Sequence, residues 1–164
     1  MNRRELMGMA SVGVVAAAFI SQRVMMRSSA EGGGNFSYNL TDAQWRAKLS
    51  PDSYEVLRKA GTEKTYSSPL LKEYRAGTFA CAGCDQPLFS SKVKYDSKTG
   101  WPSFWDVLPK ATLKRPDFKI GTPRTEIICS NCGGHIGHVF TDGPKPTGQR
   151  YCMNGLALKF KSAA

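Results

Sequence analysis

Apolar and polar positions follow three different patterns along the chain. Residues 7–20 form an apolar stretch of about fourteen residues without a charge, shorter than the roughly twenty that a membrane-spanning helix needs. Residues 41–61 carry apolar side chains at helical spacing, whereas from residue 77 onward they occur in short runs broken by Gly, Pro, Asp and Asn. The pattern therefore predicts an apolar N-terminal segment, a short helical region and a β-rich body.

The helical region contains two helices with recognisable start and stop signals. Thr41 followed by Gln44 is a capping-box pattern and predicts a helix over 42–49. Pro51 stands at the first position of a second helix, which Gly61 is expected to end. Its apolar side is formed by Tyr54, Val56 and Leu57.

The β-rich body contains seven candidate strands. They lie at 78–81, 87–89, 117–120, 125–129, 137–140, 150–153 and 156–160. Most of these runs are short, and their spacing with turn residues between them is typical of antiparallel sheets.

Composition places the chain among globular proteins of one ordinary domain. It has 164 residues, of which 41% are hydrophobic and 22% charged. The formal net charge is +10, and the first thirty residues carry +3 of it. A basic surface attracts anionic partners but says little about the fold.

The N-terminus resembles the twin-arginine signal of a bacterial exported protein. Arg3 and Arg4 precede the apolar stretch, and small residues follow at 28–30, where a signal peptidase could cut. We therefore expect an export signal over 1–30, a flexible linker over 31–40 and one domain over 41–164, with the protein in the bacterial periplasm. An uncleaved N-terminal membrane anchor and an organelle presequence are the alternatives.

Four of the five cysteines form two Cys-x-x-Cys pairs. The first pair is Cys81 and Cys84, and the second is Cys129 and Cys132. Four thiolates complete a closed tetrahedral zinc site, so the pairs predict one structural zinc ion. Redox-active pairs and two disulfides are the alternatives, and a site mixing cysteine with His135 or His138 is a third. The long gap between the pairs is unlike a zinc ribbon, so no nucleic-acid partner is expected.

The fifth cysteine, Cys152, is left over for other chemistry. A lone cysteine is often a small core residue. Here Arg150 and Asn154 lie two positions away on either side, which on a strand is the same face. The guanidinium favours a thiolate, and Asn154 can donate hydrogen bonds, so Cys152 is a candidate nucleophile.

Two histidines and an aromatic cluster complete the set of candidate residues. His135 and His138 could supply acid–base chemistry to a nearby nucleophile, or one could be buried and the other exposed. Trp101 belongs to an aromatic cluster that could be core or could form an apolar wall for a substrate.

Taken together, these motifs resemble the methionine sulfoxide reductases of the B type. The resemblance runs from about residue 49 to 160. It is carried by the two cysteine pairs with the segments 61–63, 87–89, 95–97 and 100–104, and by 137–140, 142–144, 146–148, 150–154 and 158–160. It implies a mainly β fold of two small antiparallel sheets, called a β-tent, with short N-terminal helices and a four-cysteine zinc site.

The resemblance also implies a reaction, the reduction of methionine-R-sulfoxide in proteins. By analogy, Cys152 attacks the sulfoxide sulfur as a thiolate and becomes a sulfenic acid, while methionine is released. His135, His138 or Asn154 would hydrogen-bond or protonate the sulfoxide oxygen.

The substrate pocket follows from the same analogy. Trp101 would receive the substrate methyl group, Phe140 would line the pocket, and Arg150 and Asp142 would order it.

Two positions depart from the common pattern of the family. Thr99 stands where many members carry a second, resolving cysteine. An external thiol, such as thioredoxin or another small or protein thiol, is therefore expected to reduce Cys152, and the sacrifice of a zinc ligand is the alternative. Gly155 starts a Gly-Leu-Ala run where many relatives have Ser-Ala-Ser, and we expect this to alter loop packing near Asn154.

The expected partners are oxidised proteins that carry methionine sulfoxide and the thiol reductant. A monomer is expected, with contact to a membrane only through an uncleaved signal. A zinc-stabilised domain of the same fold that only binds partners is the alternative function, since a fold does not dictate an activity.

Overall fold

The computed structural model of the protein describes residues 35–163. The expected export signal, 1–30, and the first part of the expected linker lie outside the described residues. Within 35–163, no helix combines the length and apolar character needed to cross a membrane. The described residues 35–40 contact the body, because Tyr38 N–H donates to Asn131 O at 2.9 Å and Leu40 packs against the core.

Two short helices precede the sheets, close to the places that the capping signals indicate. Helix α1 is Asp42–Lys48, and its capping box with Thr41 and Gln44 is present. Helix α2 is Pro51–Lys59, capped by Ser50. It ends at Lys59, because Ala60, one residue before the predicted glycine, takes the left-handed conformation with φ 52°.

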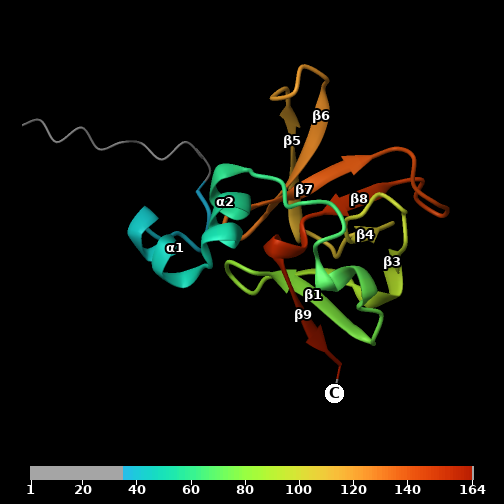
Figure 1. Ribbon diagram of the computed structural model, residues 1–164, viewed down its shortest axis with the longest axis horizontal. Coiled ribbons are helices and arrows are strands. Elements are labelled where there is room, and N and C mark those ends of the chain that lie inside the picture. The colour runs from blue at the N-terminus through green and yellow to red at the C-terminus, as the bar shows by residue number, and fades with distance from the viewer. Residues whose placement is uncertain (1–34, 164) are drawn as a thin grey trace, which may run out of the picture. The chain divides into compact units, whose positions relative to one another are not determined.

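The strands form two antiparallel sheets (Figure 1). The smaller has the order β2-β1-β9, with β1 Gly77–Cys81, β2 Pro87–Ser90 and β9 Leu158–Ser162. The larger has the order β3-β4-β8-β7-β6-β5. Its strands are β3 Lys94–Tyr95, β4 Ser103–Phe104, β5 Thr112–Asp117, β6 Arg124–Cys129, β7 His135–Phe140 and β8 Arg150–Met153. Three short 3-10 helices connect them, η1 Pro69–Lys72, η2 Ser91–Val93 and η3 Gly155–Ala157.

The predicted fold class is confirmed, but one predicted strand is wrong. The predicted strand over 117–120 is the turn that follows β5, in which Phe118 and Ile120 are exposed. The strand itself is β5, which ends at Asp117. It is an edge strand of mostly exposed residues with Pro116 inside it, so it lacks the apolar alternation on which the prediction relied. The two-residue strands β3 and β4 were also not predicted.

Aromatic side chains of the two sheets meet in the core between them. Phe79 of the smaller sheet meets Phe104 of the larger sheet with ring centroids 5.0 Å apart. Phe89 stacks on Phe104 at 4.3 Å. Figure 1 shows the helices at one side of this pair of sheets and the β5–β6 hairpin projecting away from the smaller sheet.

Candidate functional site

A row of polar side chains crosses the larger sheet. Cys152 on β8 is paired with Ser103 on β4 and, on its other side, with His138 on β7. His138 is in turn paired with Glu126 on β6, which is paired with Arg115 on β5. Directly paired residues project from the same face of a sheet. The fold thus places Cys152 and His138, predicted separately from the sequence, side by side on one face.

His135 is buried and held by a carboxylate. Its Nδ1 lies 2.6 Å from Glu126 Oε1, and Arg115 hydrogen-bonds the same carboxylate at 3.1 Å. Burial alone would raise the pKa of Glu126, but the hydrogen bonds from His135 and Arg115 lower that pKa to about 2. Glu126 is therefore an acceptor, so His135 Nδ1 donates the proton and Nε2 is left without a partner among the described residues.

His138 is held by a carboxylate through its other ring nitrogen, Nε2. Its Nε2 lies 2.7 Å from Asp117 Oδ2, which also accepts from Arg124 at 2.6 Å. A backbone hydrogen bond from Lys119, with those from His138 and Arg124, keeps the pKa of Asp117 well below its usual range. Because Asp117 is ionised, His138 Nε2 must donate, and Nδ1 of the neutral ring is the free acceptor. Desolvation lowers the pKa of His138 despite this hydrogen bond.

The Cys152 thiol is half-buried among donors and one cation. Burial raises the pKa of Cys152, whereas a hydrogen bond from Thr99 and the charge of Arg150 act to lower it. The charge of Arg150 lowers the pKa of Cys152 as expected, but the desolvation of the buried thiol raises this pKa by more. Cys152 is not part of a disulfide.

Arg150 is itself oriented by two other predicted residues. Its guanidinium makes two 2.9 Å hydrogen bonds with the Asp142 carboxylate. It also lies over the Phe140 ring, 4.3 Å from the centroid. Phe140 and Arg150 are paired across β7 and β8, so both share the face of Cys152. The three side chains form one unit beside the thiol.

Trp101 and Asn154 are connected through the backbone of Glu63. The indole N–H of Trp101 donates to Glu63 O at 3.2 Å, and Glu63 N–H donates to Asn154 Oδ1 at 3.0 Å. Asn154 also donates to Ile136 O at 3.1 Å. The Glu63 carboxylate accepts from the backbone N–H groups of residues 155 and 156. Asn154 is thus a buried link that orders the turn after Cys152.

Five residues around the site were not predicted as site residues: Glu63, Thr99, Ser103, Asp117 and Glu126. Glu126 had a signal, because a charge inside an otherwise apolar strand needs a buried partner. Glu63, Thr99 and Ser103 lie in or beside segments that carry the family resemblance. Their contacts, like those of Asp117, join elements far apart in the sequence, so no local pattern indicated their roles.

The four remaining cysteines gather at the other predicted centre. Their Sγ atoms all lie within 4.8 Å of one another. Cys81 and Cys132 are 3.7 Å apart and Cys84 and Cys129 3.5 Å apart. Zinc–sulfur bonds of about 2.3 Å in a tetrahedron would separate the sulfurs by about 3.8 Å, so the cluster fits a zinc ion. None of the four forms a disulfide.

Each cysteine pair lies at the end of a strand of a different sheet. Cys81 ends β1 and Cys129 ends β6, and each pair closes a turn in which the first cysteine's carbonyl accepts a backbone hydrogen bond four residues on. Arg58 of α2 donates to Cys132 O at 3.1 Å. A bound metal would therefore join the two sheets beside the helices.

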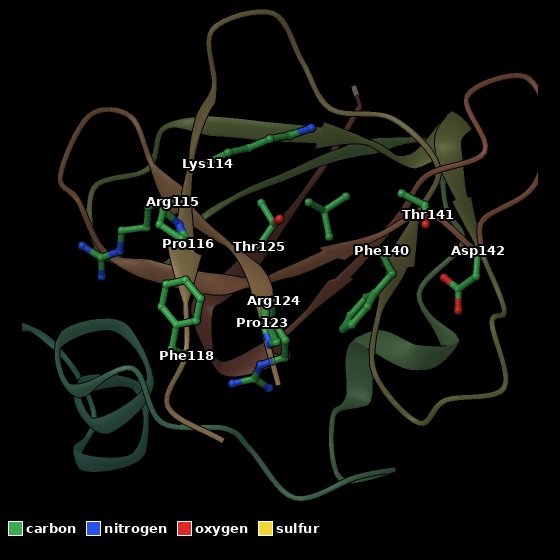
Figure 2. A pocket seen from close by; sticks show the side chains of 11 residues that line it. Lys114, Arg115, Pro116, Phe118, Pro123, Arg124, Thr125, Phe140, Thr141 and Asp142 are labelled. Atoms are coloured by element: carbon green, nitrogen blue, oxygen red, sulfur yellow. The ribbon is translucent and has the colours of Figure 1, made fainter. Parts of the chain in front are cut away.

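An open groove lies along β5, β6 and β7 (Figure 2). Its volume is about 700 Å³, and Figure 2 shows the side chains that line it, several of them basic or aromatic. The groove includes Phe140 and Asp142 but neither Cys152 nor His138. It borders the predicted site without containing the nucleophile.

Comparison with known proteins agrees with this geometry. The SelR domain model matches residues 49–162. The peptide methionine sulfoxide reductase MsrB of Leptospira interrogans is 48% identical over 128 residues, which cover 77% of this chain and 98% of the relative. The corresponding protein of Thiobacillus denitrificans is 51% identical over 121 residues, which cover 73% of this chain and 92% of the relative. Methionine-R-sulfoxide reductase B2, mitochondrial, of Rattus norvegicus is 47% identical over 75% of each chain. The chain therefore belongs to the SelR-domain family, the methionine sulfoxide reductases of the B type.

Proposed function

We propose that the protein reduces methionine-R-sulfoxide in oxidised proteins to methionine, using thiols as the electron source. The observation that carries this proposal is the pairing of Cys152 with His138 across β8 and β7. Cys152 is the one cysteine outside the four-cysteine cluster. The family and the names of the relatives support the same reaction.

The first step is attack of the Cys152 thiolate on the sulfoxide sulfur. A bond forms between Cys152 Sγ and the substrate sulfur, and the sulfoxide oxygen takes up two protons and leaves as water. A water molecule then attacks Cys152 Sγ, methionine leaves with the electron pair of the sulfur–sulfur bond, and Cys152 ends as a sulfenic acid. The free Nδ1 of neutral His138 can accept the thiol proton, and the resulting imidazolium can donate a proton to the sulfoxide oxygen. A sulfoxide oxygen only accepts hydrogen bonds, so a donor beside the thiol matches it.

The unpartnered Nε2 of His135 carries no proton in the neutral ring, so it can accept but not donate a hydrogen bond, and His138 is the candidate donor to that oxygen. His135 and His138 have ring centroids 5.3 Å apart, and their carboxylate partners leave opposite ring nitrogens free. We assign Asn154 to holding the turn after Cys152 in place, because both its amide oxygen and nitrogen already have backbone partners.

Selectivity for the R epimer requires that the methyl group and the oxygen have fixed sides. The Trp101 indole is anchored by its hydrogen bond to Glu63 O, and it is proposed to form the wall for the methyl group. Phe140 on β7 and the Arg150–Asp142 pair would form another wall of the pocket. A fixed wall and fixed donors reject the other epimer, whose oxygen would point at the indole.

The sulfenic acid must be reduced by external thiols. Two thiols supply two electrons, giving a disulfide, water and the Cys152 thiol. The other four cysteines are gathered in the four-cysteine cluster, so we propose thioredoxin or another small or protein thiol as the reductant.

We also propose that the four cysteines hold one structural zinc ion. All four ligand positions would be filled by thiolates, which leaves none for a substrate. The role of Cys81, Cys84, Cys129 and Cys132 would be to fix the strand ends of both sheets, and thereby the strand that carries Cys152.

The test is turnover of the two dabsyl-methionine sulfoxide epimers with dithiothreitol and with thioredoxin. We expect methionine to form from the R epimer only, with either reductant. Equal rates for both epimers would contradict the proposed pocket, and no product from either would favour the binding-domain alternative.

A further inference from the structure

Three hydroxyl groups form a chain that ends at the catalytic sulfur. Thr99 Oγ1 lies 3.8 Å from Cys152 Sγ and 2.8 Å from Ser97 Oγ. Ser97 Oγ lies 2.7 Å from Ser103 Oγ, and Ser103 donates to Trp101 O at 3.1 Å. Ser103 is fully buried and Thr99 half-buried. The chain therefore runs from the sulfur into the protein interior.

Each hydroxyl can donate one hydrogen bond, so the direction of the chain depends on whether Cys152 is protonated. With a thiol, the S–H can donate to Thr99, Thr99 to Ser97, Ser97 to Ser103, and Ser103 to the Trp101 carbonyl. With a thiolate, Thr99 can turn its hydroxyl toward the sulfur while Ser97 donates to Thr99. Hydrogen bonds in such a chain strengthen one another.

The loop that carries Thr99 is held from outside the sheet. Thr65 Oγ1 donates to Thr99 O at 3.2 Å, and Tyr66 donates its hydroxyl to Lys98 O at 2.8 Å. Gly100 has φ 87°, and a Cβ there would come within 2.1 Å of Thr65 Oγ1. The hydroxyl of Thr99 is thus positioned before any substrate arrives, which is the condition for effective stabilisation of charge.

We propose that Thr99 is a further catalytic residue, which donates a hydrogen bond to the Cys152 thiolate and is itself supported by Ser97 and Ser103. The donor offsets part of the cost of placing a charged sulfur in a half-buried site. The role of Thr99 in turnover rests on the proposed reductase function, because turnover near neutral pH would need this hydroxyl. The hydrogen bond from Thr99 to the thiolate does not depend on that function.

Other charged or titratable groups also face Cys152. They are Arg150 on β8, His138 on β7, Tyr95 on β3 and Asp142 after β7, which acts through Arg150. All four remain unchanged in variants of Thr99 and Ser97. A change in the ionisation of Cys152 in such variants therefore reports on the hydroxyl chain alone.

The experiment measures the rate of iodoacetamide alkylation of Cys152 against pH in the full chain with its metal bound. The modified Cys152 peptide is followed by mass spectrometry, which separates it from the other four cysteines. The variants are Thr99→Val, which removes only the hydroxyl, Thr99→Ser, which keeps it, and Ser97→Ala. Thr78→Val on β1 is the matched control outside the site.

We expect Thr99→Val to move the midpoint of the pH profile upward by about one unit, so that alkylation at neutral pH is about tenfold slower. Thr99→Ser and Thr78→Val should keep the wild-type midpoint, and Ser97→Ala should shift it upward by less than Thr99→Val.

An unchanged midpoint in Thr99→Val, or equal shifts in Thr99→Val and Thr99→Ser, would overturn the proposal. Folding of each variant is checked by its bound zinc and circular dichroism. If Thr99→Val does not fold, Ser97→Ala decides, and a wild-type midpoint there overturns the proposal. Alkylation needs no sulfoxide, so failure of the proposed reductase activity would be seen separately, in the assay of the two epimers.

Discussion

At the scale of single residues, the surroundings of each thiol separate one cysteine from the other four. Cys81, Cys84, Cys129 and Cys132 lie among sulfurs, where only a metal or disulfide chemistry would satisfy them. Cys152 lies beside a hydroxyl and a guanidinium, and the residue paired with it on β7 is His138. The same side chain is therefore suited to ligation in one place and to nucleophilic attack in the other.

Replacing Cys152 with serine should abolish turnover of the R epimer while leaving the metal site intact. Serine at this position is a much weaker nucleophile and cannot form the sulfenic acid. The measurement is methionine formation, together with zinc per chain by elemental analysis. Cys132→Ser is the contrasting variant and should lose zinc. Turnover that survives in Cys152→Ser would remove this residue from its proposed role.

Gly155 is needed because of its neighbour Ser68. A Cβ at position 155 would come 1.9 Å from Ser68 Oγ and 2.6 Å from Ser68 Cβ. We expect Gly155→Ala to lower the free energy of unfolding by roughly 1–3 kcal/mol, measured by urea denaturation. Adding Ser68→Gly should recover part of the loss. Equal stability of Gly155→Ala and wild type would show that the turn after Asn154 can move at little cost.

At the scale of elements, three strands are joined by one carboxylate. Glu126 on β6 accepts from Arg115 on β5 and from His135 on β7. The adjacent Asp117 on β5 accepts from Arg124 on β6 and His138 on β7. These contacts hold the edge strand β5, whose own side chains are mostly exposed, and fix both histidines.

The Glu126 contacts predict a loss of stability in acid. The pKa of Glu126 is about 2 in the folded protein against an ordinary 4.5. Its contribution is therefore complete above about pH 4.5 and disappears as the pH falls toward 2, amounting to roughly 3 kcal/mol. Urea unfolding between pH 6 and 3 should show this decline, and Glu126→Gln should show a flatter one. Parallel pH curves for the two proteins would exclude Glu126 as the cause.

At the scale of the whole molecule, the four-cysteine cluster and the thiol site occupy different parts of the two-sheet body. The cysteine cluster joins the end of β1 in the smaller sheet to the end of β6 in the larger one. The row of polar side chains that includes Cys152 crosses the larger sheet through β4, β8, β7 and β6. Metal binding should therefore affect activity through the relative positions of the sheets.

Removal of zinc by a strong chelator should lower the thermal midpoint by ten degrees or more, on the order of the stability that structural zinc supplies. Activity should fall in parallel and return when zinc is added back. Calorimetry and the R-epimer assay on the same samples make the comparison. A chelated protein with full activity and an unchanged midpoint would mean that the cluster has no structural role.

Export remains a proposal, since residues 1–30 lie outside the described structure. We propose that Arg3 and Arg4 direct the protein to the periplasm. Mass spectrometry of the mature protein in a bacterial host should find a shortened N-terminus in the periplasmic fraction, and replacing both arginines with lysine should retain the full chain in the cytoplasm. An intact N-terminus in the membrane fraction would favour the anchored alternative.

The sequence by itself determined the helices, most strands, the cysteine pairs and the candidate nucleophile, because each depends on residues close together in the chain. Capping at Thr41 and the spacing of Cys81 and Cys84 are local properties. Only the tertiary structure decided which groups meet Cys152. Loop packing brings Thr99 to its sulfur, strand register places His138 opposite it on β7, and the carboxylates that set the histidine protons come from other strands. Such contacts join residues distant in the chain, so no local pattern encodes them.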